Sequence, residues 1–179
     1  MDKPKTNLDF RLMSMTYKIR DFFSPRIYIL REVGIKSGFT VLDYGCGPGS
    51  YIIPIEQMVG QSGKVYALDI HPLAIKSVKA IASKRQFTNV ETILSDCKTG
   101  LPDSSVDVVL LYDIFHDLGN PNAVLTELYR VLKPTGFISL SDHHLKENDI
   151  VTGLTGSGLF KLSGKTKKTY SFGKTESHK

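Results

Sequence analysis

The chain has 179 residues, of which 41% are hydrophobic, and both values are ordinary for one folded domain. No apolar run approaches the roughly 20 residues that span a bilayer, and no apolar signal core follows Met1, so we expect neither a membrane-spanning segment nor a leader. Two cysteines, Cys46 and Cys97, argue against a disulfide framework, and we expect reduced thiols in a cytoplasmic protein.

The first 34 residues predict two helices. Residues 10–23 carry apolar side chains at helical spacing, and a proline then breaks the pattern and starts a second helix over 26–33, which a glycine ends. We expect no regular structure over residues 1–8. We therefore divide the single domain into a helical cap, residues 1–34, and a core, residues 35–179.

The most informative stretch is VLDYGCGPGS, in which a buried strand ends near Asp43 and turns through three glycines into a helix. Such a turn opens a Rossmann-like unit, because glycines let the backbone approach a ligand closely. The spacing of Gly45, Gly47 and Gly49 is shorter than that of a dinucleotide loop. The Asp43 carboxylate would repel a pyrophosphate and would suit an ammonium group, directly or through a water. These features favour S-adenosylmethionine (SAM), and a tight structural turn is the alternative.

The next predicted strand, residues 64–69, ends in Asp69. This acid lies about twenty residues past the glycine loop, the spacing at which a carboxylate takes ribose hydroxyls. Its alternative role is to cap the following helix, predicted over 72–85, whose first residue is a proline. The pairing of Asp69 with the glycine loop favours the ribose role.

Two further strands lead to polar residues. A strand over 90–94 leads to Asp96, and an almost uninterrupted apolar run over 106–112 predicts a central parallel strand that leads to Asp113. Ligands of open α/β sheets bind at the carboxyl ends of the strands. We therefore expect these acids to share a pocket with the glycine loop.

The rest of the chain completes an α/β pattern. A helix over 121–132 and a strand over 136–141 continue the alternation, which predicts right-handed crossovers and a doubly wound sheet. Two short segments, 158–162 and 167–172, are joined by a link that permits only an antiparallel pair. We expect a Rossmann-like, mostly parallel sheet that a C-terminal antiparallel hairpin closes, so that the tail completes the fold.

Together these motifs resemble those of class I SAM-dependent methyltransferases, in particular the ubiquinone/menaquinone biosynthesis group. Residues 41–51 are similar to the family's first motif, and 101–107 to its LPF-x-D-x-SFD link, shortened and without the Phe. Residues 127–136 are similar to its E-x-x-RVLKPGG element, with Thr135 in place of the first glycine. The resemblance is strong over about 35–142. It implies the closing hairpin and N-terminal helices that lie over the cofactor site.

The resemblance also implies roles for single residues. Asp69 matches the ribose-binding acid, and Asp96 with Cys97 matches the pair that faces the adenine. Tyr112 would contribute backbone contacts to the methionine end, while Tyr17 would either offer its aromatic face to the sulfonium or simply pack. The expected cofactor-binding residues are Asp43, Gly45, Cys46, Gly47, Gly49, Asp69, Ile70, Asp96, Cys97, Tyr112 and Tyr17.

Methyl transfer from a sulfonium is an in-line displacement, so the protein mainly positions the nucleophile and the methyl group. His116, just after a predicted strand end, is the candidate general base for an acceptor that arrives protonated. It would otherwise pack across the pocket without moving a proton. Asp142, His143 and His144 suggest a metal site, but adjacent residues on an extended chain point to opposite faces, so no metal is expected.

The chain has no long insertion between its strands, which favours a small-molecule acceptor. The net charge is +5, and several lysines lie in the tail. A solvated surface accounts for them, and a nucleic acid or an anionic membrane surface is the less favoured explanation. A methyltransferase for RNA, protein or a membrane-borne isoprenoid therefore stays open, as does a SAM-binding protein without catalysis. Nothing in the sequence indicates the oligomeric state.

Overall fold

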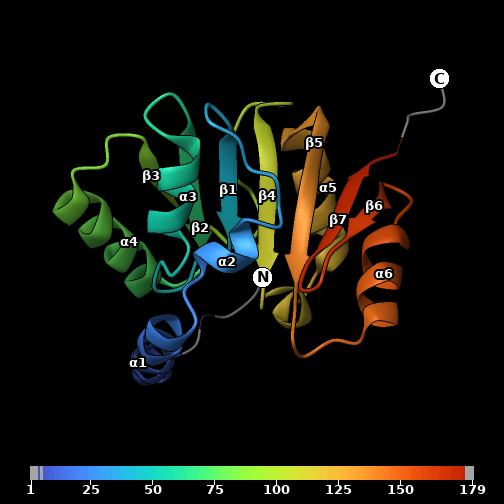
Figure 1. Cartoon of the computed structure of the whole chain (residues 1–179). Helices are drawn as coiled ribbons and strands as arrows, with labels where there is room; N and C mark the ends of the chain where they lie inside the picture. The colour runs from blue at the N-terminus through green and yellow to red at the C-terminus, as the bar shows by residue number, and fades with distance from the viewer. Residues whose placement is uncertain (1–3, 5, 176–179) are drawn as a thin grey trace.

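The computed structural model describes residue 4 and residues 6–175. Its centre is a seven-stranded sheet in the order β3-β2-β1-β4-β5-β7-β6 (Figure 1). The first five strands run parallel, and β7 pairs antiparallel with both β5 and β6. The predicted fold class is thereby confirmed. The strands are β1 (Thr40–Tyr44), β2 (Lys64–Asp69), β3 (Val90–Leu94), β4 (Val106–Tyr112), β5 (Leu132–Ser141), β6 (Phe160–Lys165) and β7 (Tyr170–Lys174).

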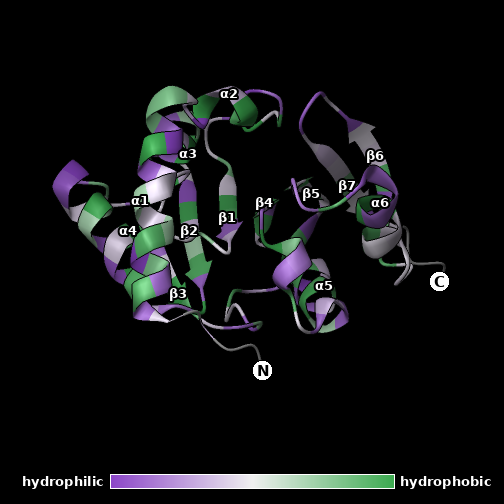
Figure 2. Cartoon of the chain, turned by 90° about the horizontal axis from the view of Figure 1, so that it is seen from below, coloured by the Kyte–Doolittle hydropathy of each residue, from purple (hydrophilic) through white to green (hydrophobic). Residues whose placement is uncertain are grey.

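Helices cover both faces of this sheet, with α3 and α5 on opposite sides (Figure 2). Val108 and Leu110 of β4 pack into one core cluster, whereas Val109 and Leu111 pack into the other. This double burial explains why β4 is a continuous apolar run. The helices are α1 (Asn7–Phe23), α2 (Ile27–Leu30), α3 (Ile52–Val59), α4 (Pro72–Arg85), the short 3-10 helix η1 (Phe115–Asp117), α5 (Pro121–Val131) and α6 (Glu147–Thr155).

The N-terminal helix starts earlier than predicted. Thr6 caps α1, because its hydroxyl accepts a hydrogen bond from the Asp9 amide at 3.2 Å and donates one to the Asp9 carboxylate at 2.7 Å. The expectation of no regular structure over residues 1–8 is therefore wrong from Asn7 onward. Residues 1–3 and 5 lie outside the described part of the chain.

Three other boundaries differ from the predicted ones. The second helix is a single turn, α2, β5 begins at Leu132 directly after α5, and the hairpin strands lie two or three residues later than expected. Helix α6 was not predicted at all. Its buried Ile150 and Leu154 pack on the core, and a Cβ at Gly153 would lie only 2.7 Å from the Phe115 ring. Tertiary packing, rather than helix propensity, therefore stabilises α6.

The order of the strands creates the place for a site. Strands β1 and β4 are neighbours, although β2 and β3 lie between them in the sequence. At this switch in the order of strand addition, the loops after β1 and β4 diverge and leave a crevice. Helix α1 lies beyond the carboxyl ends of both strands (Figure 1). Over the described residues, none of the helices combines the length and the apolar character that crossing a bilayer requires.

Candidate functional site

A cavity of about 260 Å³ lies at the carboxyl ends of β1, β2 and β4. One wall is the inner face of α1, and the others are the loops that follow the strands. Most of the predicted cofactor-binding residues line it: Tyr17, Gly45, Cys46, Gly47, Asp69, Ile70, Asp96 and Tyr112. Asp43, Gly49 and Cys97 do not form part of this lining.

The three glycines of the loop after β1 differ in what surrounds them. All three have positive φ, at 79° for Gly45, 51° for Gly47 and 92° for Gly49. A Cβ at Gly45 would lie 2.7 Å from Ile114, and one at Gly49 would lie 2.8 Å from Ile81 of α4. Around a Cβ at Gly47, no described atom beyond the chain neighbours lies within 4 Å. Gly47 therefore faces the open cavity, whereas packing requires glycine at positions 45 and 49.

Asp69 ties the end of β2 to this loop. Its Oδ2 accepts a hydrogen bond from the Gly47 amide at 2.8 Å, and its Oδ1 accepts one from the His71 amide at 2.8 Å. Burial raises the pKa of Asp69, and these backbone hydrogen bonds oppose that rise. Each carboxylate oxygen has a further lone pair, so Asp69 can still accept from ligand hydroxyls. The cap of α4 is instead His71, whose Nδ1 accepts from the Leu73 amide.

Asp43 lies beneath the loop, within β1, and only 2% of it is exposed. Its Oδ2 is buried and finds no hydrogen-bond partner among the described residues. Burial, and then the charge on Asp69, raises the pKa of Asp43 to about 7. An unpartnered buried carboxylate oxygen is costly to the fold, so a cationic group or a water that reaches it would be bound favourably.

The remaining predicted residues occupy different surroundings. Asp96 lines the cavity, whereas Cys97 packs against the core cluster that contains Val109 and Leu111 of β4. Both Cys46 and Cys97 are thiols, and burial raises the pKa of the Cys46 thiol. The Tyr112 hydroxyl lies 2.9 Å from the Ser139 hydroxyl, and burial raises the Tyr112 pKa. Tyr112 therefore presents a fixed, neutral ring to the cavity.

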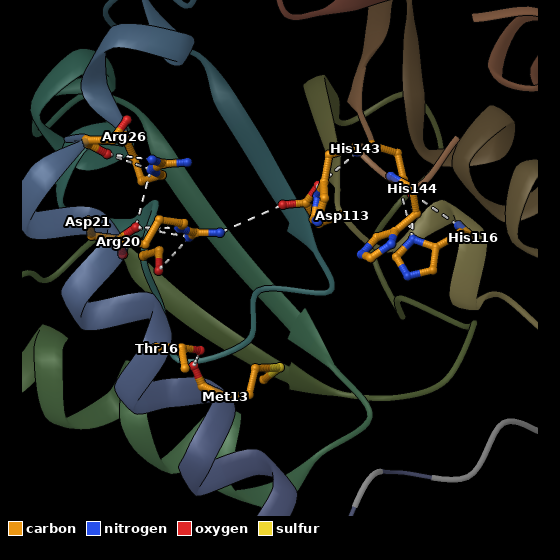
Figure 3. Close-up of polar contacts among 12 residues, drawn as sticks. Met13, Thr16, Arg20, Asp21, Arg26, Asp113, His116, His143 and His144 are labelled. Carbon is orange, nitrogen blue, oxygen red and sulfur yellow. Dashed lines mark hydrogen bonds and ion pairs between the residues drawn. The ribbon is translucent and has the colours of Figure 1, made fainter. Parts of the chain in front are cut away.

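Arg20 connects α1 to the far side of the site. Its guanidinium stacks 4.0 Å from the centroid of the Tyr17 ring, so one face of that ring already carries a cation. The same guanidinium lies 2.9 Å from Asp21 and 3.7 Å from Asp113, which follows β4 (Figure 3). Asp113 has a φ of 53° and also lies 2.8 Å from His143 Nδ1. Asp tolerates this left-handed conformation better than most residues, which lets Asp113 face both partners.

A second, more open cavity of about 500 Å³ adjoins the first. The two share Arg20, Tyr51 and Asp113 as lining residues. Cations outnumber acids among the residues that line the second cavity: Arg20, Arg26, Lys167 and Lys168 against Asp113 and Asp142. Arg20 and Arg26 also pair with Asp21, which lies outside this lining. Sequence reasoning missed this cavity, because its walls come from α1, the β4 and β5 ends and the β6–β7 turn.

His116 lines neither cavity and instead lies between them. Its Nδ1 is 2.8 Å from Oδ2 of Asp142, whose side chain is fully buried, and its amide donates to the same carboxylate at 3.2 Å. Its Nε2 is 3.5 Å from Asp117. Asp142 lines the second cavity and Asp117 the first. The ring is therefore held by Asp142 at Nδ1, while Nε2 lies near Asp117, which lines the first cavity.

The histidines after β5 lie close to this pair. The His144 ring centroid is 4.2 Å from that of His116 and 3.9 Å from that of His143 (Figure 3). The described residues contain no group of three or more side chains arranged to hold a metal ion.

The sequence signal for Asp113 and Asp142 was their place directly after strands. Arg20 gave no such signal, because only the folded chain brings it to the site.

Comparison with known proteins finds methyltransferases. A family model described as "Methyltransferase domain" matches residues 35–172. A demethylmenaquinone methyltransferase of Geobacillus sp. (strain WCH70) is 30% identical over 125 residues, which are 69% of this chain and 53% of that protein. Aklanonic acid methyltransferase DauC of Streptomyces sp. (strain C5) is 34% identical over 92 residues, 50% of this chain and 42% of that protein. The chain spans about half the length of these curated relatives.

Among solved structures, a SAM-dependent methyltransferase from Aquifex aeolicus is similar over nearly its whole length. The TM-score is 0.75 at 28% sequence identity, and the match covers 90% of this chain and 96% of that one. The two chains therefore share the arrangement of strands that creates the cavity described above.

Proposed function

We propose that this chain, which belongs to the methyltransferase-domain family, transfers a methyl group from SAM to a small-molecule acceptor. The observation that carries the proposal is the pairing of a cavity-facing Gly47 with Asp69, whose carboxylate fixes the Gly47 amide. Such a pair leaves the backbone open to a nucleoside ligand and offers it a hydroxyl acceptor.

The donor set of the first cavity fits SAM. Asp69 has lone pairs for the ribose hydroxyls, and Asp96 would accept from the exocyclic amine of the adenine. The unpartnered Oδ2 of Asp43 would accept from the ammonium through a water, because Asp43 lies beneath the cavity rather than on its wall. When bound, SAM supplies a methyl group on an already activated sulfonium, so the chain's own residues have to bind, orient and exclude water.

His116 is the candidate base in this proposal. The Asp142 carboxylate accepts from Nδ1–H, which leaves Nε2 as the nitrogen that can take up a proton. Because His116 lines neither cavity, it would receive the proton of the acceptor through Asp117 or a water. An acceptor that arrives deprotonated would not need this step, and His116 would then only hold the strand ends together.

The second cavity is the proposed acceptor site. It shares the lining residues Arg20, Tyr51 and Asp113 with the first cavity, so an acceptor bound there would adjoin the cofactor. The surplus of cations on its wall favours an acceptor that carries a carboxylate or another anionic group. A cytoplasmic location, inferred from the reduced cysteines, belongs to the same proposal.

The test is calorimetric titration of the protein with SAM and with S-adenosylhomocysteine, followed by a screen of small anionic acceptors for S-adenosylhomocysteine release. We expect micromolar binding of both nucleosides and loss of it in Asp69→Ala. Asp149→Ala, which removes an exposed acid from α6, is the matched control and should bind normally. Full-strength binding by Asp69→Ala would contradict the cofactor site. Binding without turnover of any acceptor would favour a SAM-binding protein without catalysis.

A further inference from the structure

The outer face of α1 carries large apolar side chains that the described structure leaves uncovered. These residues recur every three or four positions, so they lie along one side of the helix. Phe10 is the only buried residue of α1. We call this set the α1 stripe: Leu8, Leu12, Met15, Ile19, Phe22 and Phe23, which are 67%, 53%, 58%, 55%, 80% and 80% exposed.

Such a stripe is unusual for a chain that works alone in water. Single exposed apolar residues are common, but contiguous patches of them mark surfaces that bind something. Elsewhere in the described chain, the exposed large hydrophobic residues are scattered singly: Tyr28, Leu94 and Leu162. The stripe therefore points to a partner that covers this side of α1.

Two cations run along one edge of the stripe. Arg11 and Lys18 are seven residues apart, so they lie on the same side of α1, and both are exposed. Neither forms an ion pair with another residue in the described part of the chain. The acids of α1 are already engaged, Asp9 by Thr6 and Asp21 by Arg20 and Arg26. The outer side of α1 therefore combines a continuous apolar face with unneutralised positive charge.

We propose that the α1 stripe docks this protein on the surface of an anionic phospholipid bilayer, with α1 lying in the plane of the surface. Interfacial helices bury an apolar face at the level of the headgroups and acyl chains and place flanking cations beside lipid phosphates. The long side chains of Arg11 and Lys18 can reach the phosphates while their stems lie along the apolar face. This inference does not depend on the proposed methyl transfer.

Charge favours a lipid surface over a second copy of the chain. Two antiparallel α1 helices related by a two-fold axis would bring the same edge of each helix together, so Arg11 of one copy would face Lys18 of the other. Like charges at that distance repel. An anionic bilayer would instead attract both cations along their whole edge.

The inner face of α1 gives the docking a structural consequence. Phe10, Met13 and Tyr17 line the cofactor cavity from the side opposite the stripe. A bilayer that holds the stripe would therefore also hold one wall of that cavity.

The test is co-sedimentation of the full chain with vesicles of phosphatidylcholine alone and of phosphatidylcholine with phosphatidylglycerol. We expect binding to the anionic vesicles that high salt weakens. Leu12→Glu with Ile19→Glu should reduce this binding about tenfold or more, because two exposed apolar side chains that the bilayer would bury are replaced by anions. Arg11→Glu with Lys18→Glu should also reduce it about tenfold or more.

Leu94→Glu with Leu162→Glu is the matched control, because it places the same charges on exposed leucines outside α1. This variant should bind anionic vesicles as the parent does. Thermal unfolding reports whether each variant is folded, so this control does not depend on SAM binding. The proposal is overturned if the parent does not bind anionic vesicles, or if the Leu12/Ile19 variant binds them as strongly as the parent does. It is also overturned if light scattering shows that the parent is a dimer and the Leu12/Ile19 variant a monomer, because the stripe would then bind a second copy.

Discussion

The Gly47 amide donates a hydrogen bond to Asp69 Oδ2 across 2.8 Å, which joins the loop after β1 to the end of β2. Gly47 follows β1 and Asp69 ends β2, and these neighbouring parallel strands end at the same edge of the sheet. This contact couples the conformation of the glycine loop to the orientation of the acid, which the His71 amide also holds. A ligand that binds one of these residues therefore has the other within reach.

Gly47→Val should abolish SAM binding while leaving most of the fold intact. The new side chain would stand in the cavity, since no described neighbour lies within 4 Å of its Cβ position. The positive φ adds strain of about 1–2 kcal/mol. Gly100→Val is the control, because Gly100 also has a positive φ and open surroundings but lies outside the cavity. Calorimetric titration and thermal unfolding should show equal destabilisation of both variants and loss of binding in Gly47→Val alone.

The pH dependence of SAM binding should report Asp43. Its pKa is raised from 3.8 to about 7, so the acid is largely protonated below pH 7 in the folded chain. If its carboxylate accepts from the SAM ammonium, affinity should rise as the pH increases through about 7. Asp43→Asn should bind SAM weakly and with a flat pH profile. A wild-type affinity that falls over the same interval would contradict the assignment.

The same group should lower stability as the pH rises. In the unfolded chain Asp43 loses its proton near pH 3.8, whereas in the folded chain it keeps the proton to about pH 7. The unfolded state therefore binds fewer protons between these values, and this group's contribution to the free energy of unfolding falls across the window. At pH 8, Asp43→Asn should stabilise the SAM-free protein by roughly 1–3 kcal/mol in urea unfolding.

Glu127 should make the free energy of unfolding fall as the pH is lowered, the opposite of the effect expected for Asp43. Burial tends to raise its pKa, but hydrogen bonds from Arg130 and Thr99 prevail and lower it from 4.5 to about 2. Its stabilisation is therefore complete above pH 4.5 and is lost as the pH falls from about 4.5 to about 2. Glu127→Gln should cost about 2 kcal/mol at pH 7 and much less at pH 3 in urea unfolding. Glu91→Gln, at an exposed ion pair with Lys64, should change stability little at either pH.

His116→Ala should lower kcat about a hundredfold if the imidazole accepts the acceptor's proton. The acidic limb of the kcat profile should then disappear, while SAM affinity stays within about twofold of the parent value, because His116 lines neither cavity. His144→Ala is the control, since the His144 ring packs beside His116 but only its backbone amide donates to Asp142. A His116→Ala enzyme that keeps the acidic limb would show that the histidine only positions the strand ends.

Charge reversal on the β6–β7 turn should raise KM for the acceptor. Lys167→Glu with Lys168→Glu removes two cations from the second cavity. For an anionic acceptor we expect KM to rise about tenfold or more with kcat and SAM affinity nearly unchanged. Lys76→Glu with Lys79→Glu, on the exposed side of α4, is the charge-matched control. An unchanged KM in the Lys167/Lys168 variant would remove the argument for an anionic acceptor.

The parts of the fold that were predictable rest on local patterns. The apolar run of β4 and the acid at the end of β2 are readable because a strand's burial and a strand's end both leave marks in a few adjacent residues. Arg20, Asp113 and Asp142 are different. All three line the second cavity only because α1 folds back over the sheet and β5 lies beside β4, so this grouping depends on residues far apart in the sequence. Helix α6 was missed for the same reason, since packing stabilises it.

The unequal surroundings of the three loop glycines bear on how this sequence can diverge. Gly45 and Gly49 are held by the side chains of Ile114 and Ile81, whatever the cavity contains. At Gly47, only the positive φ and the space that the ligand needs restrict the choice of residue. In a lineage that ceased to use the cofactor, drift would therefore begin at Gly47, with asparagine as the replacement that tolerates its conformation. Related sequences that keep the glycines at positions 45 and 49 but not at position 47 would therefore be expected to keep the fold without binding the cofactor.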